Sequence, residues 1–226
     1  MRFRGWFVND EDLLTEWHEP SGQRHIDYPY YATVIAHDIA QAVYEAALRS
    51  GANLIIPASF LDITNPPEAK LIELAVQRGL YVSQHHIEPL GVSHFGFENY
   101  WKHRGCKAEF AFGAEPEKVH ECWEHFAETW YRIAGDKVVW QLGLRGKGDR
   151  SIWHSDASVT RETAGEFISR ALREQIEIIR RIDRRDAPPM TLTLWAEMSE
   201  LMGQGRLTLP PGIIVVFSDF GPTQEM

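Results

Sequence analysis

The sequence predicts an α/β fold: a TIM-type (β/α) barrel, incomplete at about six strand–helix units, forming one domain over residues 1–226. Short, almost continuously apolar segments alternate along the chain with longer segments of helical spacing, which is typical of a parallel sheet covered by helices. Prolines open several of the helical segments and glycines close them. Polar and charged residues recur directly after the apolar segments, where the active site of a (β/α) barrel lies.

The individual elements follow from this alternation. Strands are expected at residues 5–8, 53–58, 80–84, 137–144, 191–195 and 213–217. Helices are expected at residues 30–50, 66–78, 115–133 and 163–183. Between the third strand and the third helix we expect a long functional loop, because the segment is too rich in aromatic residues for disorder. Trp195, at the end of the fifth strand, is interpreted as core packing.

Composition excludes several classes of protein. The formal net charge of −9 argues against general nucleic-acid binding, which needs clustered Lys and Arg. No apolar stretch approaches the length of a membrane span, and the first residues lack the apolar run of a signal peptide. A cytoplasmic location is therefore expected. The two cysteines, Cys106 and Cys122, indicate neither a disulfide framework nor a metal-binding pattern.

The candidate site is defined by polar residues that follow strands. Because the carboxyl ends of barrel strands open on one face, residues far apart in the sequence are expected to converge there. Loops are often polar, so any single position carries less weight than the set. The set comprises Asp10, Glu11, His85, His86, Glu88, Arg145, Asp149, Glu197 and Asp219.

Several carboxylates at one barrel face favour glycoside hydrolysis, in which one carboxyl group protonates the leaving oxygen and another activates water or attacks the sugar. The catalytic candidates are Glu88, Asp149, Glu197 and Asp219. Arg145 is either a clamp for a substrate carboxylate or part of a buried ion pair with Asp149 or another strand-end acid. A G-x-S-x-G elbow and an H-E-x-x-H motif are absent from the sequence, so serine hydrolysis and metal catalysis are disfavoured, and no cofactor is expected.

Three segments resemble glycoside hydrolase family 115, the xylan α-glucuronidases. They are RGWFVNDEDLL (residues 4–14), QHHIEPLG (residues 84–91) and LGLRGKGDRSIW (residues 142–153), and the resemblance extends to about residue 221. It implies a TIM-barrel core that releases (4-O-methyl)glucuronic acid from xylo-oligosaccharides with inversion, and so a role in xylan degradation and carbohydrate metabolism. It also implies that Asp10, Glu11, His85, His86 and Arg145 bind an acidic oligosaccharide substrate.

The chain departs from the family in ways that leave two alternatives open. Family members are longer, with a domain before the barrel and further domains after it, and a closed barrel needs eight strands. The chain could therefore be a carbohydrate-binding remnant that holds uronates without cleaving them. It could also be a structural fragment whose open sheet is covered by self-association or by missing C-terminal domains.

Overall fold

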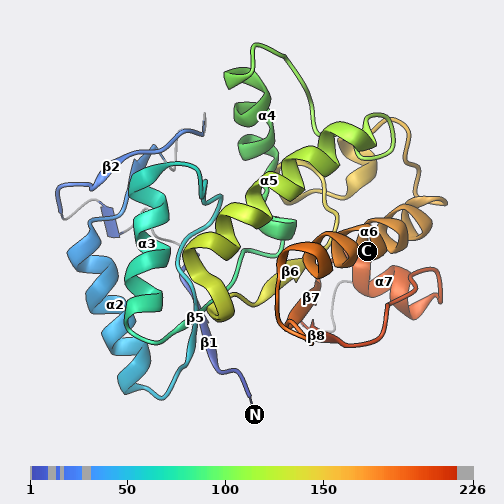
Figure 1. The fold of residues 1–226 in the computed structure, drawn as a ribbon. Coiled ribbons are helices and arrows are strands. Elements are labelled where there is room, and N and C mark those ends of the chain that lie inside the picture. The colour runs from blue at the N-terminus through green and yellow to red at the C-terminus, as the bar shows by residue number, and fades with distance from the viewer. Residues whose placement is uncertain (1, 10–13, 16–17, 27–31, 218–226) are drawn as a thin grey trace.

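The computed structural model describes residues 2–9, 14–15, 18–26 and 32–217. Its centre is a set of parallel strands in two three-stranded sheets (Figure 1). In the first, β1 (Gly5–Phe7) pairs with β4 (Leu54–Ile56), which pairs with β5 (Tyr81–Val82). In the second, β6 (Trp140–Leu142) pairs with β7 (Met190–Leu194), which pairs with β8 (Ile213–Phe217).

A single parallel bridge joins the two sheets. Val82 at the end of β5 lies opposite Val138, just before β6, and the Val139 amide donates to the Val82 carbonyl at 2.8 Å. The six parallel strands therefore follow one another in the order of the sequence. That order is the order of strands in a (β/α) barrel.

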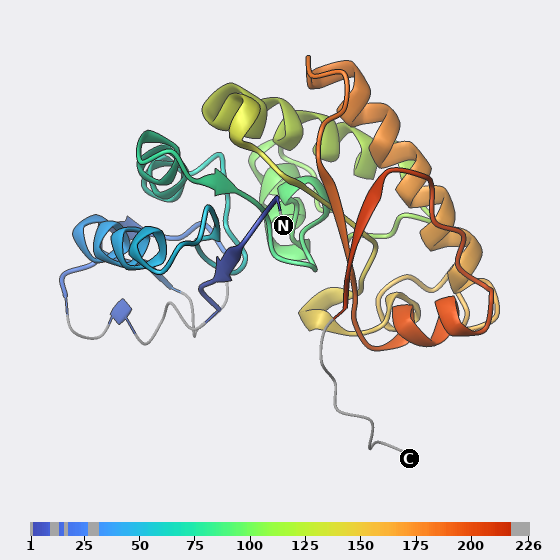
Figure 2. The same cartoon turned by 90° about the horizontal axis from the view of Figure 1, so that it is seen from below.

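Helices cover the outer side of these strands. Seen from below, they form an arc around the sheet, and the described strands do not close into a barrel (Figure 2). The long helices of this arc are α2 (His37–Arg49), α3 (Pro66–Gln77), α5 (Pro116–Ala134) and α6 (Ala164–Ile182). The prediction of an α/β fold with parallel strands is confirmed, and the arrangement is that of a partial barrel.

The core lies between the sheet and the helices. Along α5 the buried residues Val119, Trp123, Phe126 and Trp130 recur at spacings of three and four, so they form one apolar face. Trp123 and Trp130 are fully buried, as is Trp140 of β6. Such large aromatic side chains contribute much of the apolar area that holds the helices on the sheet.

In the described part of the chain, two α-helices with stated bounds lie where no helix was predicted. The long loop expected after the third strand contains α4 (His94–His103), which Ser93 caps by accepting a hydrogen bond from the Gly96 amide at 2.9 Å. A short helix, α7 (Glu197–Gly203), follows β7. The first predicted helix begins at His37 rather than near residue 30, after a small antiparallel pair formed by β2 (Gly22–Gln23) and β3 (Thr33–Val34).

The outermost strands carry exposed apolar side chains. Trp6 of β1 is 41% exposed, and Phe217 of β8 is 72% exposed. These strands are also the two edges of the set, so their unpaired backbone groups and apolar side chains lie together.

Candidate active site

A cleft of about 470 Å³ lies at the carboxyl ends of the strands. Each of the six parallel strands, or the segment directly after it, contributes to its wall. The lining residues are Phe7, Asn9, Ile56, His85, His86, Gln141, Asp149, Thr193, Trp195 and Val216. Of the predicted site residues that the structure describes, His85, His86 and Asp149 line this hollow, whereas Glu88, Arg145 and Glu197 are not part of its lining.

Arg145 holds two of the predicted carboxylates. Its Nε atom lies 2.7 Å from Asp149 Oδ1, and an Nη atom lies 2.6 Å from Glu197 Oε2. The other Nη atom donates to the backbone oxygen of Asp149. Arg145 is 3% exposed, and every nitrogen of its guanidinium is engaged. This geometry corresponds to the buried ion pair, one of the two interpretations open for Arg145 from its sequence.

His86 completes the cluster from the opposite sheet. Its Nε2 atom lies 3.2 Å from Asp149 Oδ1. Burial lowers the pKa of His86, although the hydrogen bond to Asp149 works in the opposite direction. Burial also tends to raise the pKa of Asp149, but the hydrogen bond from His86 and the charge of Arg145 outweigh it, so this pKa lies below its usual value. Asp149 is therefore held as a carboxylate at neutral pH.

Glu88 does not line the cleft. It is 1% exposed, and its Oε1 atom accepts a hydrogen bond from the Phe60 amide and lies 3.6 Å from His85 Nδ1. The structure thus places Glu88 behind His85, where it joins the loop after β4 to the loop after β5. The carboxylate of Glu88, which was predicted to be catalytic, therefore does not face the cleft directly.

Residues with strained backbone conformations lie near this site. Four non-glycine residues in the described part of the chain have positive φ, namely Phe60, Leu90, Asp149 and Ala196. Asp149 belongs to the charged cluster, and Ala196 directly precedes Glu197. The Phe60 amide donates a hydrogen bond to Glu88, and Leu90 lies two residues after Glu88. Such conformations cost about 1–3 kcal/mol each and cluster at functional sites.

Two residues that the sequence did not indicate fix the segment that carries Arg145. The buried side chain of Gln175, on α6, donates to the Gly143 carbonyl at 2.6 Å and accepts from the Gly143 amide at 3.0 Å. His94, the first residue of α4, lies with Nε2 2.8 Å from the Arg145 carbonyl oxygen. Because a carbonyl only accepts, His94 is the donor. Neither residue follows a strand, which is why the pattern of strand ends missed them.

Trp195 lines the cleft instead of packing in the core. β7 ends at Leu194, so Trp195 follows the strand, and its ring lies 5.6 Å from that of His86. His85 and His86 also line the same cleft, because β5 ends at Val82 and the alternation of a strand no longer applies to them. Three predicted site residues, Asp10, Glu11 and Asp219, lie outside the described residues.

The described ranges, residues 2–9, 14–15, 18–26 and 32–217, bear on metal binding and on membrane insertion. Within them no group of three or more His, Cys, Asp or Glu side chains is arranged to hold a metal ion. No helix there has the length and apolar character required to cross a bilayer.

Parallel strands in sequence order, with polar residues at their carboxyl ends, form the arrangement of a partial (β/α) barrel. The sequence profile of glycosyl hydrolase family 115 matches residues 1–224, and the chain belongs to this family. A comparison with curated proteins found none that matches.

The fold is also found in a solved structure. It is described as a novel family GH115 4-O-methyl-α-glucuronidase, BtGH115A, with specificity for decorated arabinogalactans. The TM-score is 0.73 at 22% identity over 94% of this chain, a likeness that shows the fold. The chain spans 27% of the length of that relative.

Proposed function

We propose that this chain carries the catalytic cleft of an α-glucuronidase, which releases (4-O-methyl)glucuronic acid from decorated xylo-oligosaccharides. The observation that supports it best is the pair of carboxylates, Asp149 and Glu197, held on one buried guanidinium at the carboxyl ends of the strands. Family membership supports the reaction class, and the solved relative is described as a 4-O-methyl-α-glucuronidase with specificity for decorated arabinogalactans.

The electrostatics of the cluster suggest separate roles for the two carboxylates. Arg145 places one positive charge between the two carboxylates. Asp149 is stabilised as an anion by His86 and Arg145. Glu197 is 7% exposed, and its Oε1 atom has no hydrogen-bond partner among the described residues. We assign activation of water to Asp149, which lines the cleft. Glu197, like Glu88, is not part of the lining, and we assign it proton donation because it shares the guanidinium of Arg145 with Asp149.

The binding roles follow from the same geometry. Arg145 has no free edge with which to clamp a uronate, so we assign it the positioning of the two carboxylates. His85 and His86 line the cleft, and we expect their imidazole rings to form hydrogen bonds with the sugar. Trp195 offers an aromatic face beside His86, which suits a sugar ring.

The reaction is tested with the full chain and an aldouronic acid substrate. We expect release of glucuronic acid with inversion, observed by NMR of the first-formed anomer. D149N and E197Q each lower kcat at least about a hundredfold, in line with the usual contribution of a general acid or base. A matched control is E73Q, which neutralises an exposed carboxylate on α3 that pairs with Lys70. Unchanged activity in both D149N and E197Q would contradict the proposal.

A second candidate, binding without turnover, is favoured by the open sheet. The edges at β1 and β8 are exposed, and the chain covers a minor part of the solved enzyme. Calorimetry with aldouronic acids separates the two functions: heat of binding with no released glucuronic acid supports the second candidate. Release of the sugar excludes it.

A further inference from the structure

A groove separate from the cleft runs between α4 and the loop after β6. Two adjoining cavities of about 540 and 620 Å³ form it, and they share Glu98, Glu109 and Lys147. One extends toward the end of α4 and the other toward Arg150 and His154. Each has the size of a site for a small ligand.

The groove is cationic on an acidic protein. Four basic side chains line it, and two carboxylates face them, whereas the whole chain has a formal net charge of −9. The basic residues are Lys102, Lys107, Lys147 and Arg150. Clustered positive charge in a hollow attracts anions even when the net charge of the protein is negative.

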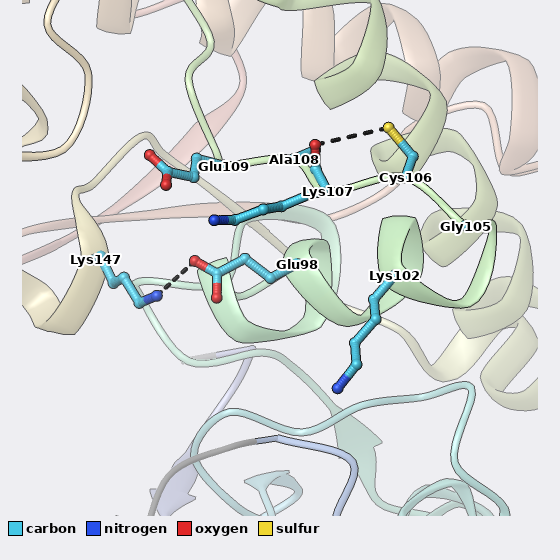
Figure 3. A pocket seen from close by; sticks show the side chains of 8 residues that line it. All are labelled: Glu98, Lys102, Gly105, Cys106, Lys107, Ala108, Glu109 and Lys147. Atoms are coloured by element: carbon cyan, nitrogen blue, oxygen red, sulfur yellow. Dashed lines mark hydrogen bonds and ion pairs between the residues drawn. The ribbon is translucent and has the colours of Figure 1, made fainter.

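Two of these lysines form no ion pair within the part of the chain that the structure describes. Lys147 pairs with Glu98 at 2.5 Å, but neither Lys102 nor Lys107 forms an ion pair with the described residues. Both are exposed. Lys107 extends along the groove above Glu98, and Lys102 projects from α4 (Figure 3). Their ammonium groups are available to a ligand.

The groove adjoins the cleft across one short turn. Asp149 lines the cleft, while Lys147 and Gly148, the residues directly before it, line the groove. A glycan whose uronate lies beside Asp149 and whose chain passes over this turn would therefore enter the groove. The two hollows are thus placed to hold successive parts of one ligand.

We propose that the groove is a second binding site for a carboxylate-bearing part of the glycan, with Lys102 and Lys107 as the residues that bind the carboxylate. The inference rests on the proposed function, because it takes the cleft as the site of the first uronate. With this second site, the protein would prefer glycans that carry more than one acidic sugar. Binding by exposed ammonium groups is sensitive to salt.

The test compares three xylo-oligosaccharides of equal length that carry no, one or two glucuronates. Their Kd values are measured by calorimetry with the full chain in the E197Q background, which prevents turnover. We expect the doubly substituted ligand to bind about tenfold more tightly than the singly substituted one, as expected for an added charged contact. We expect K102A/K107A to abolish that difference and to leave the Kd of the singly substituted ligand unchanged.

The control variant, K70A/K137A, removes the same charge from α3 and from the segment before β6, and it should keep the tenfold difference. The proposal is overturned if the two glucuronates bind no better than one, or if the control also loses the preference. If none of the ligands binds, the proposed function fails and this inference fails with it. If one glucuronate binds and the second adds nothing, only this inference fails.

Discussion

The Nε2 atom of His94 lies 2.8 Å from the backbone oxygen of Arg145, and this bond joins the start of α4 to the centre of the charged cluster. His94 is 7% exposed, and its ring packs against Phe110 at 4.5 Å. The side chain therefore positions the residue that in turn holds Asp149 and Glu197.

Replacing His94 tests this positioning role. H94F keeps a ring but removes the donor, and we expect kcat to fall about tenfold because the Arg145 carbonyl loses a bond worth about 1–1.5 kcal/mol. H94Q retains an N–H near the position of Nε2 and should restore most of the activity. The folded fraction of each variant is measured by circular dichroism, and kcat is calculated for the folded protein. If His94 were purely structural, H94F would lower the folded fraction but leave this kcat unchanged.

The same histidine makes folding dependent on pH. Burial lowers the pKa of His94 to about 4, opposed by the bond to Arg145, while an unfolded chain has a His pKa near about 6.5. Between these values the unfolded state binds the additional proton, so the free energy of unfolding rises with pH from about 4 to about 6.5. The expected contribution is roughly 3 kcal/mol. Urea denaturation across this range should show a shallower rise in H94Q, and parallel curves for the two proteins would contradict the prediction.

Removing the shared guanidinium should destabilise the fold strongly. In R145M, the carboxylates of Asp149 and Glu197 lose the cation that compensates their burial, and we expect a loss of about 3–5 kcal/mol. The matched control is R181M, because Arg181 pairs with Glu124 at the surface, where both side chains are about half exposed. That pair should contribute less than about 1 kcal/mol. Equal losses in the two variants would show that the Arg145 cluster is not effectively buried.

Ala196, directly before Glu197, has φ 47° and ψ −121°, a conformation that glycine adopts readily. Gly135 at the end of α5 has nearly the same angles, φ 52° and ψ −133°, and a methyl group there would meet no atom within 4 Å. We therefore expect A196G to stabilise the fold by about 1 kcal/mol and G135A to destabilise it by a similar amount. Chemical denaturation measures both. A destabilised A196G would show that Ala196 is not strained.

The strands were predicted well because an apolar run in a parallel sheet is a local property of the sequence. Residues 213–217 form β8 as expected. Arg145, Asp149 and Glu197, which were chosen by their positions after strands, do lie in contact, while their roles stay predictions. The segment that forms α4 was predicted as a loop, since its aromatic residues and Gly96 obscure a helical pattern. Its capping residue, Ser93, was the available signal.

The partnerships within the site could not be predicted in the same way. Whether Arg145 meets a substrate or Asp149 depends on the path of the chain between them, which local sequence does not determine. Glu88 follows a strand, as a cleft residue would, yet its carboxylate turns back toward the Phe60 amide. His94 becomes important through a contact made across 51 residues of sequence.

The bridge between Val82 and Val138 has a mechanical consequence. Within the described residues, it is the one strand pairing between the two sheets, and His86 follows the first sheet while Asp149 follows the second. Side-chain hydrogen bonds of Ser83 to Val139 and of Gln84 to Gln141 cross the same joint, so a rotation of one sheet against the other would stretch them together with the contact between His86 and Asp149. The state of ionisation at Asp149 would then report how tightly the two halves of the protein are closed.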